Sequence, residues 1–345
     1  MRSILVTGAA GTVGGRVLNL LVEIPGVERV VALDRVPTEG RDNVEESEVT
    51  VERIEADLLE LDLAPILAGV DIIIHLAEDR GRDANARTAR VVLERLLEAA
   101  SAEPVEQFVL LSSALVYGAH SDNPVPITEG QPLRPSNLAH AQLKAELEAL
   151  ATTWARNSGV RLTILRPAVA LSEGDESWIG SALRAAMAVR PEQVDPPVQF
   201  LHHDDLARAV VHVVDKRLDG VYNVASDGWI GADAFRSLRG ETEVRLPERA
   251  GRLRHRAAMV FADRSLLEGL QPYVTHPWVV ATDKLRATGW TPRYTSEEVY
   301  ILGTTAPLLN SLGPQKRQEL ALGLAGAAGA AALGVAIWAA RRLTR

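Results

Sequence analysis

The chain has 345 residues, with 37 Lys and Arg residues against 45 Asp and Glu residues, which gives a formal net charge of −8. This acidic balance argues against a dedicated nucleic-acid binder, because such proteins need a basic face to neutralise phosphates. Hydrophobic residues make up 47% of the chain and cysteine is absent, so wholesale disorder, disulfides, thiolate catalysis and cysteine-ligated metal sites are excluded.

Short apolar runs alternate with longer helical patterns over the first half of the chain. Strands are predicted at residues 4–7, 30–33, 49–54, 72–75, 108–112 and 162–165. Helices are predicted between them at residues 13–23, 62–68, 83–101 and 135–157. Most of the strands are β-branched and almost continuously apolar, as in a parallel sheet covered on both faces. The alternation predicts right-handed βαβ crossovers and therefore a doubly wound parallel Rossmann sheet of the α/β class.

The rhythm of the sequence changes after residue 167. Loop-like residues dominate 172–197, which hold one predicted helix at 179–189. Residues 200–205 lead into a predicted helix at 206–215, and residues 220–225 are predicted as a further strand. We therefore expect a Rossmann domain over residues 1–170 and a smaller substrate lobe over residues 171–310, with the chain returning to the sheet within the lobe.

Glycines punctuate the turn after the first predicted strand, which reads TGAAGTVG over residues 7–14. Gly8, Gly11 and Gly14 allow a tight turn, a close backbone approach to a pyrophosphate, and close packing of the next helix on the strand. The first turn of that helix, with Thr12 and Val13, offers N–H groups and a positive dipole end to phosphates. This pattern predicts a dinucleotide site.

An acidic residue stands where such a site needs one. Asp34 ends the second predicted strand, 20 residues after Gly14. A carboxylate there accepts hydrogen bonds from the adenosine ribose hydroxyls and repels a 2′-phosphate, which favours NAD over NADP. The neighbouring Arg35 is the residue that would pair with the extra phosphate of NADP.

Further motifs resemble those of the extended short-chain dehydrogenase/reductase family, the NAD-dependent epimerases and dehydratases. They follow the family order at residues 7–14 (TGAAGTVG), 56–58 (ADL), 74–77 (IHLA), 111–118 (LSSALVYG), 165–167 (LRP), 200–207 (FLHHDDLA), 221–224 (VYNV) and 289–292 (GWTP). The resemblance implies a Rossmann fold with a substrate lobe and NAD as the cofactor. It also implies cofactor contacts at Asp57, Leu58, Leu76 and Ala77.

The resemblance implies catalytic roles for two residues and breaks at a third. Ser113 would hold the reacting oxygen, and Lys144 would bind the nicotinamide ribose. The family's tyrosine, four residues before the lysine, is replaced by His140. The i, i+4 spacing still places His140 and Lys144 on one helix face.

Three hypotheses follow for His140. In the first, the site has lost catalysis and retains NAD binding. In the second, the imidazole takes the acid/base role near neutral pH, although a nearby Lys144 would lower its pKa. In the third, His140 only lines the pocket and another group acts, for which Tyr117 is the candidate.

The function predicted first is hydride transfer on a hydroxylated substrate such as a nucleotide sugar, with a small molecule as partner and a homodimer as the expected assembly. One alternative is a catalytically silent, membrane-tethered NAD-binding sensor or assembly protein. Another is a membrane-associated dehydrogenase of a lipid or steroid alcohol. No metal site is predicted, because neighbours such as His202 and His203 on an extended chain point to opposite faces.

Residues 320–340 read LALGLAGAAGAAALGVAIWAA, a stretch of 21 residues without a charge. A helix of this length spans about 30 Å, the thickness of a bilayer's hydrocarbon core. Basic residues flank the stretch, which predicts a membrane anchor; the alternative is an Ala-rich helix docked on the body or on a partner subunit. No signal peptide precedes the first predicted strand, so we expect the catalytic body in the cytoplasm, anchored at its C-terminus.

Overall fold

The computed structural model describes residues 2–37, 49–78, 86–173, 175–176, 178–188, 196–238 and 268–304. By its contacts the chain divides into two units, Met1–Gly303 and Thr304–Arg345. All described elements belong to the first unit except for the last residue of α11 (Ser296–Thr304). The hydrophobic segment at residues 320–340 lies outside the described residues.

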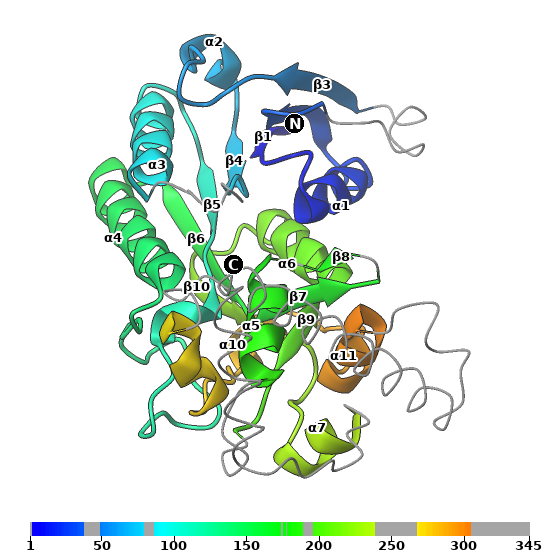
Figure 1. Ribbon diagram of the computed structural model, residues 1–345. Coiled ribbons are helices and arrows are strands. Elements are labelled where there is room, and N and C mark those ends of the chain that lie inside the picture. The colour runs from blue at the N-terminus through cyan, green and yellow to red at the C-terminus, as the bar shows by residue number, and fades with distance from the viewer. Residues whose placement is uncertain are drawn as a thin grey trace, which may run out of the picture. The chain divides into compact units, whose positions relative to one another are not determined.

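A sheet of seven parallel strands forms the centre of the first unit (Figure 1). Its order is β10-β6-β5-β4-β1-β2-β3, so the chain starts in the middle and winds outward in both directions. The strands are β1 (Arg2–Thr7), β2 (Val27–Asp34), β3 (Thr50–Glu55), β4 (Ile72–His75), β5 (Gln107–Leu111), β6 (Arg161–Pro167) and β10 (Gly220–Val224). This arrangement confirms the predicted doubly wound Rossmann sheet.

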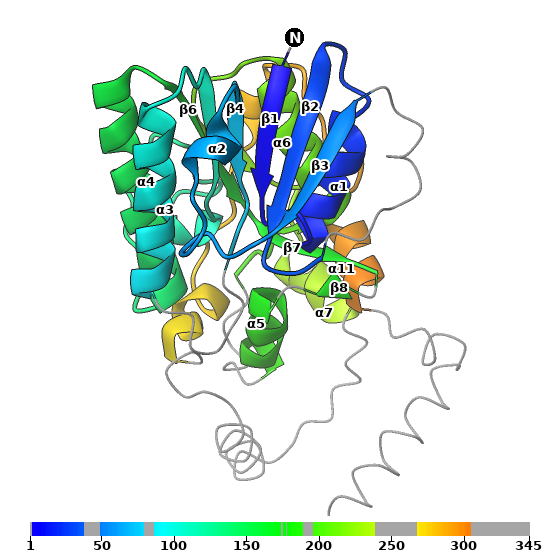
Figure 2. The ribbon, with the colours of Figure 1, turned by 90° about the horizontal axis from the view of Figure 1, so that it is seen from above.

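Helices cover both faces of this sheet (Figure 2). Side chains alternate along β1: Ile4 and Val6 pack with α1 (Thr12–Leu21) and α6 (His203–Asp215) on one face. Leu5 packs on the other face with α2 (Ala64–Leu67), α3 (Ala86–Ser101) and α4 (Ala139–Ser158). Burial on two faces explains the continuous hydrophobicity of the central strands, since neither side of the sheet meets water.

A smaller sheet of three strands follows β6. It has the order β8-β7-β9, with β7 (Val169–Ser172) antiparallel to β8 (Asp175–Glu176) and parallel to β9 (Phe200–His202). The remaining elements are η1 (Ala114–Tyr117), α5 (Trp178–Ala188), α7 (Ala232–Leu238), η2 (Gln271–Val274) and α10 (Asp283–Arg286). The predicted strand at 220–225 is confirmed as β10, which pairs with β6 at the edge of the main sheet.

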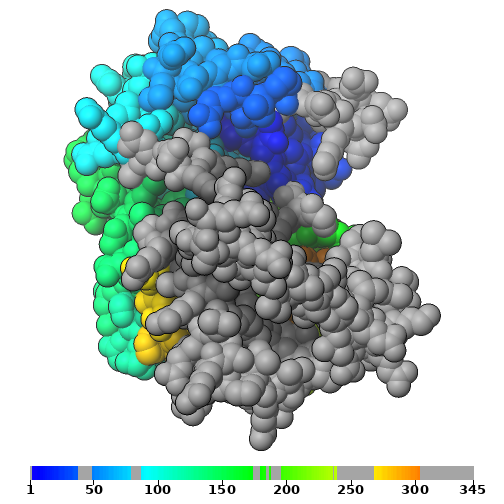
Figure 3. Space-filling model, viewed as in Figure 1, coloured from blue at the N-terminus to red at the C-terminus, as the bar shows by residue number. Residues whose placement is uncertain are grey.

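The helix boundaries differ from the prediction by a few residues, and the starts of α6 and α4 show this most clearly. α6 begins at His203 rather than at 206, because the His202 side chain caps the helix by accepting a hydrogen bond from Asp204 N–H. α4 begins at Ala139 rather than at 135, and it ends at Ser158, where the C-cap residue Gly159 has a left-handed backbone. Residues 268–274 lie against the start of α4. A Cβ on Gly269 would lie 3.0 Å from the carbonyl oxygen of Asn137. In Figure 3, residues 268–274 are yellow beside the green of α4.

Candidate active site

The first turn of the chain is built to bring the backbone close to neighbouring chain segments. Gly8 has a φ of +75°, and a Cβ on it would lie 2.6 Å from the backbone nitrogen of Ala77, just after β4. A Cβ on Gly14 would lie 2.1 Å from the carbonyl oxygen of Gly8. No side chain caps α1, whose N-cap is Gly11 and whose first residues are Thr12 and Val13. Its N-terminal N–H groups therefore suit an anion such as a pyrophosphate.

The carboxylate of Asp34 fixes this turn to the end of β2. Its Oδ2 accepts a hydrogen bond from Ala10 N–H at 3.0 Å, and its Oδ1 accepts one from Arg35 N–H at 2.7 Å. Arg35 is exposed. A carboxylate at the end of β2 beside a glycine turn is the arrangement that fits the adenosine ribose of a dinucleotide.

The other predicted cofactor residues lie along the same edge of the sheet. Asp57 follows β3 and accepts a hydrogen bond from Leu59 N–H at 2.9 Å, and Leu58 is buried. Leu76 and Ala77 follow β4, and Leu76 N–H donates to the Thr7 carbonyl at 3.0 Å. Since the carboxyl ends of parallel strands meet at one edge, the turn after β1 and the ends of β2, β3 and β4 form one continuous site. The residues present fit NAD.

Ser113 follows β5, and Lys144 is hydrogen-bonded to the last residue of that strand. Ser113 caps η1, and its Oγ accepts a hydrogen bond from Leu115 N–H at 3.2 Å. Lys144 projects from α4, and its Nζ donates to the carbonyl of Leu111 at 3.1 Å. The lysine thus ties α4 to the end of β5, two residues before the serine.

A carboxylate that the sequence analysis did not single out joins this group. Oε1 of Glu78, just after β4, lies 3.2 Å from Nδ1 of His140 and 3.7 Å from Nζ of Lys144. The side chains of His140 and Lys144 are only 12% and 9% exposed, whereas that of Glu78 is 33% exposed. The sequence offers one indication of this role. Glu78 comes directly after the IHLA motif, so it lies where the chain leaves β4 at the cofactor-binding edge of the sheet.

Burial keeps the two histidines of this region neutral. It lowers the pKa of His140 to about 4; Glu78 opposes this shift, and Lys144 adds to it. Burial likewise lowers the pKa of His75 to about 3, with Lys144 adding to the shift, and the ring Nδ1 shares a hydrogen bond of 2.7 Å with Thr7 Oγ1. At neutral pH the imidazole at position 140 is therefore uncharged and able to accept a proton.

Tyr117, the other candidate acid/base, lies in a buried polar network. Its hydroxyl donates to Asn223 Oδ1 at 2.8 Å and accepts from Arg166 Nη1 at 2.8 Å. Arg166 in turn donates from Nη2 to Glu148 Oε2 at 2.6 Å, and Glu148 accepts from Ser112 Oγ at 2.5 Å. Burial raises the pKa of Tyr117, which makes proton loss harder at neutral pH. The network gives this tyrosine a structural role that joins η1, α4, β6 and β10.

The comparisons with known proteins agree with this geometry. The sequence model of the NAD dependent epimerase/dehydratase family matches residues 4–225. The chain belongs to this family. The family is NAD-dependent, which agrees with the predicted cofactor.

Relatives among curated proteins share part of the chain. An uncharacterised protein of Mycobacterium tuberculosis is 25% identical over 236 residues, which are 65% of this chain and 62% of that protein. An uncharacterised UDP-glucose epimerase of Bacillus subtilis is 31% identical over 180 residues, 47% of this chain and 55% of that protein. The chain thus spans 55–62% of the length of these relatives.

Solved structures of similar fold cover most of the chain. A UDP-glucose 4-epimerase of Thermus thermophilus in complex with NAD superposes with a TM-score of 0.61 at 20% identity, covering 88% of this chain and 97% of the other. A dTDP-glucose 4,6-dehydratase of Bacillus anthracis in complex with NAD gives a TM-score of 0.63 at 18% identity, covering 88% of this chain and 95% of the other. At these identities the likeness shows the fold.

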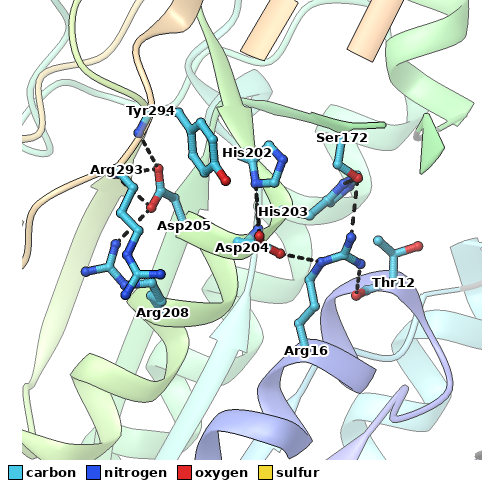
Figure 4. Close-up of polar contacts among 10 residues, drawn as sticks. All are labelled: Thr12, Arg16, Ser172, His202, His203, Asp204, Asp205, Arg208, Arg293 and Tyr294. Atoms are coloured by element: carbon cyan, nitrogen blue, oxygen red, sulfur yellow. Dashed lines mark hydrogen bonds and ion pairs between the residues drawn. The ribbon is translucent and has the colours of Figure 1, made fainter. Parts of the chain in front are cut away.

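The segment FLHHDDLA connects the second sheet to the glycine-rich helix (Figure 4). Arg16 on α1 donates from Nε to Asp204 at 2.7 Å, and His203 Nδ1 shares a hydrogen bond of 2.9 Å with Ser172 on β7. Asp205 is fully buried and accepts from the Arg293 N–H at 2.9 Å. These contacts are structural, and no group of three or more potential metal ligands occurs within the part of the chain that the structure describes.

Several predictions on the rest of the chain stay predictions. In the described ranges no helix is long and apolar enough to cross a bilayer. The predicted anchor at 320–340 falls outside those ranges, as does the stretch 239–267 of the predicted substrate lobe. The division at residue 170 and the homodimer are likewise expectations.

Proposed function

We propose that this family member is an NAD-dependent oxidoreductase that removes and returns hydride at a secondary alcohol of a nucleotide sugar, with His140 in the acid/base role. One observation carries the proposal: a neutral, buried imidazole shares a helix face with Lys144, whose ammonium is bound at the end of β5 beside Ser113. The nucleotide-sugar epimerases and dehydratases among its relatives support the substrate class.

The protein's residues divide the work as follows. Ser113 donates its hydroxyl hydrogen to the reacting oxygen and holds that oxygen in place. Lys144 binds the nicotinamide ribose, and the glycine turn with Asp34 binds the adenosine half. NAD held by these residues would supply the acceptor for the hydride on the carbinol carbon. The hydroxyl proton passes to the imidazole of His140, so that the alcohol becomes a ketone and the ring becomes an imidazolium.

The return step uses the same groups in reverse. An imidazolium with a pKa of about 4 is a strong acid at neutral pH, so it readily gives its proton back to the carbonyl oxygen as hydride returns to carbon. The forward step uses a correspondingly weak base. The positioning of His140 therefore has to compensate for its low basicity, because proton transfer depends on geometry before pKa.

The proposal is tested by following bound reduced nicotinamide by fluorescence during a single turnover. The purified protein is loaded with NAD and mixed with UDP-glucose, dTDP-glucose, UDP-glucuronic acid or a hydrophobic secondary alcohol. Reduction is expected with a nucleotide sugar, and His140→Ala is expected to slow it by about 10²–10⁴-fold. His276→Ala, which changes a histidine outside the site, serves as the matched control.

Three outcomes would redirect the assignment. NAD binding without reduction by any of these substrates would identify a catalytically silent NAD-binding protein. Reduction only by the hydrophobic alcohol would move the substrate class to lipid-like alcohols. Reduction that survives His140→Ala unchanged would reject His140 as the acid/base residue.

A further inference from the structure

Resting on the proposed function, the geometry points to Glu78 as the positioning residue for His140. We infer that its carboxylate fixes the imidazole as the tautomer protonated on Nδ1 and offsets the charge of Lys144. No other residue that the structure describes brings a carboxylate to within ion-pair distance of both side chains. The inference concerns a residue that stands immediately after the family motif at β4.

The contact joins two segments that are far apart in the sequence. Glu78 lies three residues after the end of β4. The hydrogen bond from Leu76 N–H to the Thr7 carbonyl holds the intervening chain against β1, so the sheet fixes the backbone position of Glu78. His140 and Lys144 lie one turn apart on α4, and the same oxygen of Glu78, Oε1, faces both. A single carboxylate oxygen thus lies between the imidazole and the ammonium.

Tautomer choice follows from hydrogen-bond chemistry. A neutral imidazole carries one N–H, and a carboxylate accepts hydrogen bonds and has none to donate. Nδ1 of His140 lies 3.2 Å from Oε1, so the carboxylate favours the tautomer with the hydrogen on this nitrogen, which leaves the basic lone pair on Nε2. A carboxylate in this place has the same effect as one behind a metal-bound histidine, where it fixes the tautomer and raises basicity.

Charge supplies the second effect. Among the described residues, the charged groups that act on His140 are Glu78 after β4 and Lys144 on α4. His75 on β4, which Lys144 also affects, is neutral at physiological pH. Lys144 disfavours a second positive charge on the imidazole, and Glu78 favours it. Without Glu78 the ammonium would act unopposed, and His140 would become a still weaker base.

Three substitutions separate these effects. Glu78→Gln keeps an oxygen acceptor but loses the charge, so the Nδ1–H tautomer is expected to persist while the acidic limb of the rate profile moves to lower pH. Glu78→Ala loses both the acceptor and the charge. His140 is then expected to populate both neutral tautomers, and the rate of hydride transfer should fall about 10–100-fold, as when a carboxylate behind a metal-bound histidine is removed. Glu78→Asp keeps the charge and is expected to recover part of the rate. Glu146→Gln, an exposed residue on α4, is the control.

The tautomer is read directly by nitrogen NMR of 15N-histidine-labelled protein near neutral pH, and the rate profile by single-turnover reduction. A tautomer shift at His140 in Glu78→Ala, absent in Glu146→Gln, is expected. An unchanged His140 tautomer in Glu78→Ala would overturn the inference. If the native protein transferred no hydride, the proposed function would fail, and the NMR result would still decide the positioning role of Glu78 by itself.

Discussion

Glu148→Ala is expected to be among the most destabilising single changes in the described part of the chain. The carboxylate takes hydrogen bonds from Arg166 at 2.6 Å and 3.0 Å and one from Ser112 at 2.5 Å. The side chains of Glu148 and Arg166 are only 4% and 7% exposed. The substitution leaves the guanidinium buried without its carboxylate, and breaking a buried pair in this way costs about 3–5 kcal/mol.

Urea unfolding followed by circular dichroism measures the effect. A loss of about 3–5 kcal/mol lowers the urea midpoint by roughly 1 M or more at an unchanged slope. Glu146→Ala, on the same helix but exposed, should change stability by less than about 0.5 kcal/mol. Replacing both partners, as in Glu148→Leu with Arg166→Met, should cost less than Glu148→Ala alone, since no charge remains buried. A Glu148→Ala variant as stable as Glu146→Ala would refute the role given to the network.

Three further predictions concern the cofactor edge and pH. Gly8→Ala should lower the free energy of unfolding by about 1–2 kcal/mol because of its left-handed backbone alone. It should also abolish NAD binding, since its Cβ would meet the backbone of Ala77. In the control Gly15→Ala the nearest neighbour of the new Cβ would be 4.0 Å away, so this variant should keep native stability and NAD binding. Asp34→Asn should reduce the preference for NAD over NADP in calorimetric titrations, and a native protein that prefers NADP would contradict the assignment. The pKa of His75 is lowered from 6.5 to about 3, so its contribution to stability is complete above 6.5 and is lost as pH falls toward 3. By about pH 5 this amounts to about 2 kcal/mol, and His75→Gln should flatten the dependence of the urea midpoint on pH.

The main sheet could be predicted from sequence because its strands are buried on both faces. Residues such as Ile72, Ile73 and Ile74 form a continuous β-branched run, which is typical of a strand buried on both faces of a sheet. The glycine turn and Asp34 could be predicted because a dinucleotide site imposes a local spacing on the chain.

Long-range contacts account for what the sequence did not reveal. The small sheet is held by pairings such as Leu171 with His202, which bring together short strands that carry little local signal. Glu78 meets His140 only because β4 and α4 deliver their side chains to the same edge of the sheet. From the sequence, Tyr117 is a candidate acid/base residue. In the structure its hydroxyl is hydrogen-bonded to Arg166 and Asn223, which lie on strands that follow α4, and it belongs to a structural network.

The pH dependence of hydride transfer in a single turnover tests the central claim most directly. The native protein, loaded with NAD and mixed with a nucleotide sugar, is predicted to reduce the nicotinamide at a rate that rises with pH through about 4 and is level near neutral pH, because His140 accepts the proton only when it is uncharged. His140→Ala should bind NAD as tightly as the native protein and lose that rate. A native protein that binds NAD and reduces none of it, or a His140→Ala variant with the native rate and pH profile, would contradict the account.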